Sequence, residues 1–190
     1  QFDSLADLIA FGIAPAIGLV FCYKAKAPEW FSQNLILLLI VFSIYVLCAA
    51  MRLAKYNALD SDSYHHHFSG LPSTFAGALN VILLAFMLSK GYLDNQNSLV
   101  LFVPVFTMLV SALLMVSPLF LTKLQMRKHK FITMGQIVLI ILTYISGFFF
   151  ISEKIPYISE FLLIEMAIYI VVGFGSGLLH RKEIIEEASR

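Results

Sequence analysis

The stretch LVLFVPVFTMLVSALLMVSPLFL, from Leu99 to Leu121, contains no charged residue and decides the class of fold. A helix needs about 20 consecutive apolar residues to cross a hydrocarbon core about 30 Å thick, and this stretch is long enough. Helix is the expected state, because an open strand in lipid leaves backbone groups without hydrogen-bond partners. Five further stretches have the same character: Leu5–Tyr23, Leu35–Met51, Leu71–Ser89, Phe131–Ile151 and Ile158–Leu179.

The composition of the whole chain agrees with this assignment. Of its 190 residues, 59% are hydrophobic and 13% are charged, whereas soluble domains carry about 45–50% and about 25%. So few polar residues could not cover so large an apolar core in water, which excludes a soluble globule and a disordered chain. The net charge of +1 gives no basic stripe for nucleic acid. We predict an all-α integral membrane protein with six transmembrane helices, forming one domain over residues 1–190.

The distribution of basic residues predicts the orientation in the membrane. Nine of the 13 Lys and Arg residues fall in the loops 52–70 and 122–130 and the tail 180–190, and four fall in the opposite loops. Basic residues favour the cytoplasmic side, so both termini are expected to be cytoplasmic. Near the other side, Tyr23 and Trp30 are expected to anchor the chain at the membrane interface. The second apolar stretch is expected to continue as helix beyond Met51.

Two acidic residues, Asp3 and Asp7, open the first apolar stretch at a spacing of four. On a helix this spacing places both carboxylates on one face, an arrangement suited to a divalent metal ion. A simpler interpretation is that acids at a helix N-terminus complement the helix dipole, with Asp3 as a cap. Asp7, however, lies within the apolar run, where an ionisable group is costly without a partner or a function.

Small residues follow the two acids at a spacing of four. Such a ridge lets a neighbouring helix approach closely. We expect that neighbour to carry further carboxylates and to complete a metal site. The ridge consists of Ala6, Ala10, Ala14 and Gly18.

Three segments resemble the CDP-alcohol phosphatidyltransferases. The opening FDSLAD (Phe2–Asp7), followed by IAFGIAPA, is similar to the end of the family signature D-x2-D-G-x2-A-R-x8-G-x3-D-x3-D, with Asp3 and Asp7 at its last two aspartates. The segments RLAKYN (Arg52–Asn57) and FSGLPS (Phe68–Ser73) resemble RLARFN and F-x-G-L-P of the family's CDP-diacylglycerol–serine O-phosphatidyltransferases. The first half of the signature, with two more aspartates, is then expected upstream of Gln1.

The resemblance implies a membrane enzyme that transfers the phosphatidyl group from CDP-diacylglycerol to L-serine, giving phosphatidylserine and CMP. It implies a site for two Mg2+ or Mn2+ ions on the cytoplasmic face. Asp3 and Asp7 would be metal ligands, and Asp7 would also be the general base. The substrate would contact Arg52, Lys55 and Asn57. Because residues 1–190 contain only two of the four aspartates of the family signature, this segment alone is expected to be inactive.

Several alternatives stay open at this stage. A sister enzyme could use glycerol 3-phosphate, inositol or choline as acceptor, and a non-catalytic transporter or scaffold subunit would also carry apolar helices and a small-residue ridge. Arg52 and Lys55 could be interfacial anchors that obey the positive-inside rule, and Asn57 could cap a helix end. The oligomeric state, including a homodimer, is not specified by the sequence.

Overall fold

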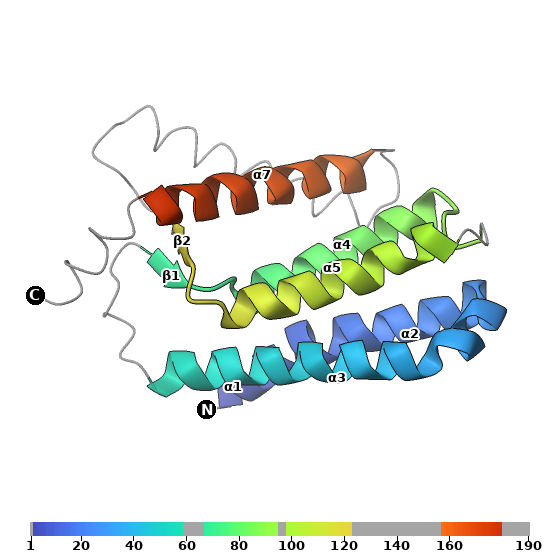
Figure 1. Cartoon of the computed structure of the whole chain (residues 1–190), viewed down its shortest axis with the longest axis horizontal. Coiled ribbons are helices and arrows are strands. Elements are labelled where there is room, and N and C mark those ends of the chain that lie inside the picture. The colour runs from blue at the N-terminus through green and yellow to red at the C-terminus, as the bar shows by residue number, and fades with distance from the viewer. Residues whose placement is uncertain (1, 59–66, 95–97, 123–156, 180–190) are drawn as a thin grey trace, which may run out of the picture. The chain divides into compact units, whose positions relative to one another are not determined.

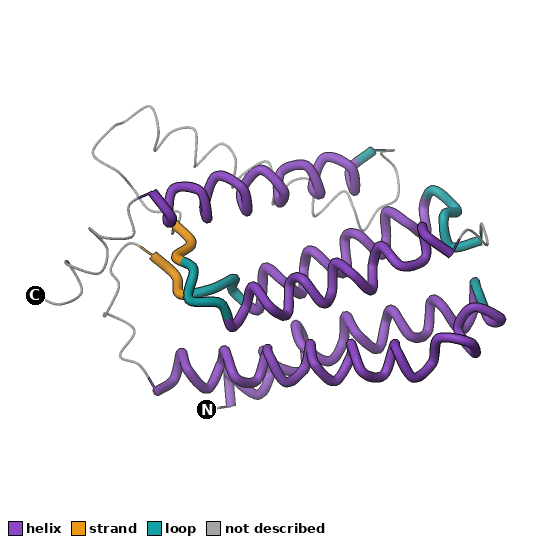
Figure 2. Tube along the Cα trace, in the orientation of Figure 1, coloured by secondary structure: helices purple, strands orange, loops and turns teal. Residues whose placement is uncertain are grey.

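The protein, represented by a computed structural model, is helical, and the structure describes residues 2–58, 67–94, 98–122 and 157–179 (Figure 1). Contacts group the chain into two units: residues 1–63 with 69–119, and residues 64–68 with 120–190. The helices of the first unit are α1 (Phe2–Asp7), the π-helical turn η1 (Leu8–Ile13), α2 (Ala14–Lys26), α3 (Pro28–Ala58), α4 (Ser73–Ser89) and α5 (Ser98–Val116). The second unit contains α7 (Ile158–Leu179), and strands β1 (His67–Ser69) and β2 (Phe120–Thr122) pair (Figure 2).

Four helical segments are long and apolar enough to cross a membrane: Phe2–Lys26, Pro28–Ala58, Ser98–Val116 and Ile158–Leu179. They coincide with four of the six predicted spans. A fifth predicted span corresponds to α4, which is shorter, at 17 residues. The predicted span Phe131–Ile151 lies outside the described residues. The expected continuation of the second helix beyond Met51 is confirmed, since α3 runs to Ala58.

The end of α5 differs from the prediction. The apolar run reaches Leu121, but the helix stops at Val116, because the residue before Pro118 is disfavoured in the α-helical region. The chain that follows bonds to the entrance of α4: the Gly70 amide donates to the Leu119 carbonyl at 2.7 Å. Gly70 has φ +76°, and a Cβ there would collide with backbone carbonyls at the end of α5, so only glycine fits this junction.

The core of the first unit contains a satisfied polar pair between α4 and α5. The Asn80 amide nitrogen donates to the Ala76 carbonyl at 2.8 Å and to the Ser111 hydroxyl oxygen at 3.0 Å. The Ser111 hydroxyl in turn donates to the Met108 carbonyl at 2.9 Å. Both side chains are buried. Hydrogen bonds of this kind hold helices together where apolar burial between helices gains little over lipid.

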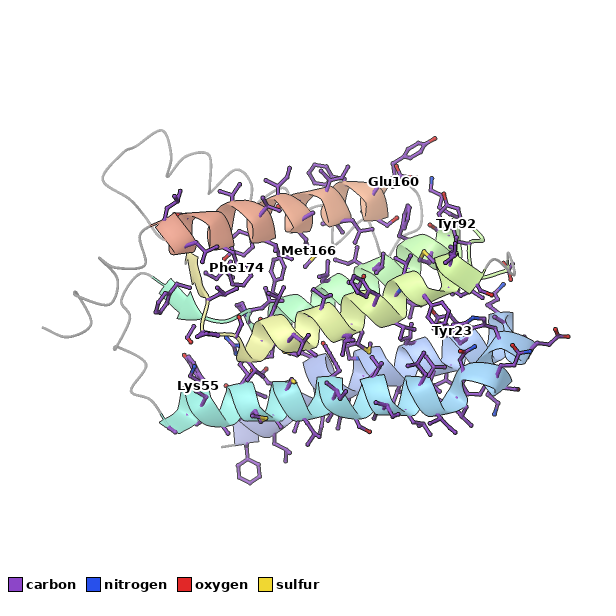
Figure 3. All side chains as sticks on the ribbon, in the orientation of Figure 1. Tyr23, Lys55, Tyr92, Glu160, Met166 and Phe174 are labelled. Atoms are coloured by element: carbon purple, nitrogen blue, oxygen red, sulfur yellow. The ribbon has the colours of Figure 1, made fainter. Side chains whose placement is uncertain are left out.

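The two predicted interface anchors, Tyr23 and Trp30, pack inside the bundle and not on its surface. Tyr23 and Trp30 are both buried in the first unit, with ring centroids 4.9 Å apart, and Trp30 stacks edge-on against Phe102 at 5.1 Å. The Tyr23 hydroxyl donates to the Leu101 carbonyl, which joins α2 to α5 (Figure 3). These aromatic side chains therefore pack inside the bundle, where the hydroxyl has a backbone partner.

The first span is interrupted by the π turn η1, whose cause can be read in the sequence. Pro15 has no amide hydrogen, so the Phe11 carbonyl lacks the donor that an α-helix would supply four residues later. The Tyr45 hydroxyl, on α3, donates to this carbonyl at 2.8 Å. Gly77 on α4 touches the same residue, since a Cβ there would lie 2.9 Å from the Phe11 Cα. The π turn is thus held from two neighbouring helices.

The predicted small-residue ridge is not where the described helices approach one another. Ala6, Ala10 and Ala14 are exposed, and Gly18 is half-buried, where an added Cβ would lie at an ordinary contact distance from Leu84. The close approaches are instead at Gly12, whose added Cβ would lie 3.4 Å from the Ala49 Cβ, and at Gly77. The ridge assumed one continuous α-helix, and the π turn breaks that periodicity.

The contact at Gly77 generates a stability prediction. Gly77→Ala should lower the free energy of unfolding by about 1–3 kcal/mol, the usual cost of overpacking, because the new methyl group meets backbone atoms of Phe11. Gly18→Ala is the matched control: its Cβ would make an ordinary 3.9 Å contact with Leu84. Thermal unfolding in detergent micelles measures both. Equal unfolding temperatures for the two variants would contradict the close packing of α4 on η1.

Candidate functional site

The paired carboxylates lie on one short helix at an end of the first unit. Asp3 and Asp7 both belong to α1, and residues four apart on a helix have Cβ atoms about 5–6 Å apart on one face. Asp3 is exposed and Asp7 is half-buried. Within the described residues Asp3 makes no hydrogen bond or ion pair, so its oxygens are available to a ligand.

The last turns of α3 face this helix. Arg52 is half-buried, and its guanidinium group is attracted electrostatically by the Asp7 carboxylate. The two groups are not in direct contact, because no ion pair within 4.0 Å joins them. The Arg52 Nε is buried and has no hydrogen-bond partner in the described part of the chain. A buried donor without a partner costs about 1–3 kcal/mol, which an anionic ligand beside Asp7 would offset.

Asn57 fixes α1 against the end of α3. Its side-chain nitrogen donates to the Ser4 hydroxyl oxygen at 2.8 Å. Ser4 lies between the two aspartates on α1, so this contact ties the carboxylate pair to α3 (Figure 1). The amide side chain of Asn57 is exposed, and it borders the site while holding the helix in place.

Lys55 extends to a different neighbour. Its ammonium group donates to the Ser69 hydroxyl oxygen at 3.0 Å, and the side chain is exposed at the C-terminal end of α3 (Figure 3). Ser69 begins the segment that enters α4 through Gly70 and Leu71. Lys55 therefore connects α3 to the entrance of α4, whereas Arg52 faces Asp7. The structure thus places Asp7 within electrostatic range of Arg52 and ties Asn57 to Ser4, whereas Lys55 contacts Ser69.

The donor set fits a divalent metal ion only in part. Carboxylate oxygens suit Mg2+ and Mn2+, and Asp3 and Asp7 offer such oxygens from one face. No group of three or more His, Cys, Asp or Glu side chains that could share a metal occurs among the described residues. These two side chains supply part of a ligand set, and water or groups outside the described residues would have to supply the rest.

Three residues around the site were not singled out in the sequence. Ser4, Tyr45 and Gly77 position α1 and the π turn, but none of them has a chemically distinctive pattern. Tyr45 did have an indirect signal, because Pro15 leaves the Phe11 carbonyl without a helical donor. A polar group on a neighbouring helix was therefore required.

Comparison with known proteins identifies similar enzymes. No protein-family profile matches the chain. It is 36% identical over 97 residues to the CDP-diacylglycerol–serine O-phosphatidyltransferase of Mycobacterium tuberculosis, covering 48% of this chain and 31% of that protein. The corresponding enzyme of Helicobacter pylori is 32% identical over 117 residues, 62% of this chain and 45% of that protein. The enzyme of Saccharomyces cerevisiae is 34% identical over 103 residues, which cover 50% of this chain and 34% of that protein.

The chain thus spans less than half the length of each of these relatives. All three carry the same name, although they come from two bacteria and a yeast. The similarity to the CDP-alcohol phosphatidyltransferases suggested by the aspartate pair is confirmed, and this chain is similar to part of a CDP-diacylglycerol–serine O-phosphatidyltransferase.

Proposed function

We propose that the protein to which this chain belongs transfers a phosphatidyl group from CDP-diacylglycerol to L-serine, releasing CMP. The observation that carries the proposal is that Asp7, on α1, and Arg52, on α3, are near enough for their charges to attract each other. The carboxylate provides a proton acceptor, and the guanidinium provides a site for an anionic group. The names of the similar enzymes supply the substrate class.

Each group has a role in the proposed transfer. The serine hydroxyl oxygen forms a bond to the phosphorus that bears the lipid, and the bond from this phosphorus to the CMP oxygen breaks. Asp7 accepts the hydroxyl proton, as a general base within hydrogen-bond reach can, and CMP leaves with the bonding electron pair. Asp3 and Asp7 would hold a divalent metal ion, which when bound neutralises diphosphate charge and stabilises the leaving group.

Arg52 is proposed to bind the carboxylate of serine or a phosphate of the CDP head. A guanidinium forms bidentate hydrogen bonds to either group, and the buried Nε without a partner leaves one donor of this fork free. Asn57 and Lys55 are proposed to border the substrate.

The reaction is proposed to occur at the cytoplasmic membrane interface, in a protein with six spans and cytoplasmic termini. Water-soluble serine and CMP can exchange there, and the acyl chains can stay in the lipid. The excess of basic residues in the loops and tail that six spans would place on the same side as the N-terminus supports this orientation through the positive-inside rule.

The proposal is tested by assaying the full-length protein in mixed micelles with Mg2+ or Mn2+ and CDP-diacylglycerol. CMP release should require serine, and phosphatidylserine should form in equal amount. Glycerol 3-phosphate, inositol and choline serve as competing acceptors. CMP release with one of these compounds but not with serine would identify that compound as the acceptor. No CMP release with any acceptor would favour a non-catalytic membrane protein.

The role of Asp7 predicts a large loss on a conservative change. Asp7→Asn keeps the size of the side chain but removes the proton acceptor, and kcat should fall by about 10²–10⁴-fold. Asp94→Asn is the matched control, because Asp94 lies near the end of α2, where it pairs with Lys26 at 3.2 Å. It should keep full activity, since exposed ion pairs contribute about 0–1 kcal/mol. Equal activity of both variants would remove Asp7 from the mechanism.

The role of Arg52 predicts a selective effect on binding. Arg52→Lys preserves the charge but loses the planar fork, and the KM for serine should rise by about tenfold, the cost of one charge-assisted hydrogen bond. The KM for CDP-diacylglycerol measured with the same variant is the internal control. A rise in that value instead would assign Arg52 to the phosphate of the lipid substrate.

A further inference from the structure

We propose that Tyr45 is a positioning residue: by holding the Phe11 carbonyl, its hydroxyl sets the rotation of α1 and with it the face of the first span on which Asp7 lies. This inference deepens the proposed function, on which its catalytic consequence rests. The rotation itself can be tested without any assay of activity.

The π turn changes which face of the first helix is buried. One face of α2 is buried, at Pro15, Ala16, Leu19 and Tyr23. Continued towards the N-terminus at 3.6 residues per turn, this face would pass through Leu5. Leu5 is instead 55% exposed, whereas Ser4 and Asp7 are half-buried. The additional residue in the π turn Leu8–Ile13 accounts for the shift, because it rotates the preceding helix by roughly 100°.

Without contacts from neighbouring helices, this segment would not be expected to keep the π turn. π turns are rare and appear mostly as single turns inserted in α-helices, often at functional sites. Pro15 favours the interruption because it withdraws the amide donor that would bond to the Phe11 carbonyl in a regular α-helix. The bond from the Tyr45 hydroxyl, at 2.8 Å, is therefore the interaction that makes the interrupted geometry stable.

The groups around Tyr45 keep its hydroxyl in place. Its side chain is completely buried, with 0% exposure, and its hydroxyl also interacts with the Asn80 side chain. Asn80 is itself bonded to Ser111. Gly77 lets α4 approach Phe11 from the other side. The Phe11 carbonyl is thus held in place by α3 and α4 together. Its position determines the rotation of α1.

Disulfide crosslinks in the full chain report this rotation directly. With Cys22 and Cys48 changed to alanine, two reporters combine Asn57→Cys with either Ser4→Cys or Leu5→Cys. A disulfide requires Cα atoms within about 7 Å, and residue 4 meets residue 57 in the structure. Tyr45→Phe should shift crosslinking from position 4 to position 5 by about tenfold, as expected for losing one buried hydrogen bond. The fraction of free thiols is measured by the gel shift of a maleimide polymer.

Tyr23→Phe is the matched control. It removes the hydroxyl of an equally buried tyrosine that bonds to Leu101, beyond the π turn, and it should leave both crosslinks unchanged. Gly77→Ala disturbs Phe11 from α4 and should also reduce the crosslink at position 4. An unchanged ratio in Tyr45→Phe, the same shift in Tyr23→Phe, or loss of both crosslinks in Tyr45→Phe would overturn the proposal.

Kinetics separate this inference from the proposed function. In the active full-length protein, Tyr45→Phe should lower kcat by about 10²-fold, the scale of a 1 Å misplacement of a reacting group. The KM for CDP-diacylglycerol should change less than twofold, and Tyr23→Phe should keep kcat. A rotated α1 with normal kcat would refute the role assigned to Asp7, whereas unchanged crosslinks would refute the role of Tyr45 alone.

Discussion

The hydrogen bond from Tyr45 to the Phe11 carbonyl is the interaction on which the first unit depends. It exists because Pro15 cannot donate an amide hydrogen, and it lies where α3 and α4 both meet the first span. A carbonyl without a partner in hydrocarbon costs several kcal/mol. Pro15 thus requires a polar partner for the Phe11 carbonyl on another helix. The bond between the Tyr45 hydroxyl and this carbonyl sets the rotation of the helix before Pro15.

The sequence predicted the spans better than their ends. Length and hydropathy identified α3, α5 and α7, because crossing a bilayer is a requirement on composition. The end of α5 depended on Ser117 and Pro118, which hydropathy treats as minor interruptions. Tyr23 and Trp30 were assigned to the interface from residue type alone, but their rings fill a gap between α2, α3 and α5. Such packing requires the relative placement of helices far apart in the chain.

The residues of the candidate site were predicted from motifs and not from periodicity. The aspartate pair and the segment Arg52–Asn57 were identified from their resemblance to a family, and the structure places them at one end of one bundle. The small-residue ridge was inferred from a continuous α-helical period, and it failed at the π turn. A single additional residue in a turn changes the face of every residue before it, and no average property of the sequence records that change.

The position of the site at helix ends follows from the cost of charge in lipid. Asp3 and Asp7 lie in the first turns of one span, and Arg52 lies six residues before the end of α3, so water can reach charges that the middle of the bilayer would exclude. The same location leaves Asp7 half-buried, where attraction to a guanidinium is stronger than in bulk water. The polar chemistry of a water-soluble acceptor and the apolar chain of a lipid can meet only in such a boundary layer.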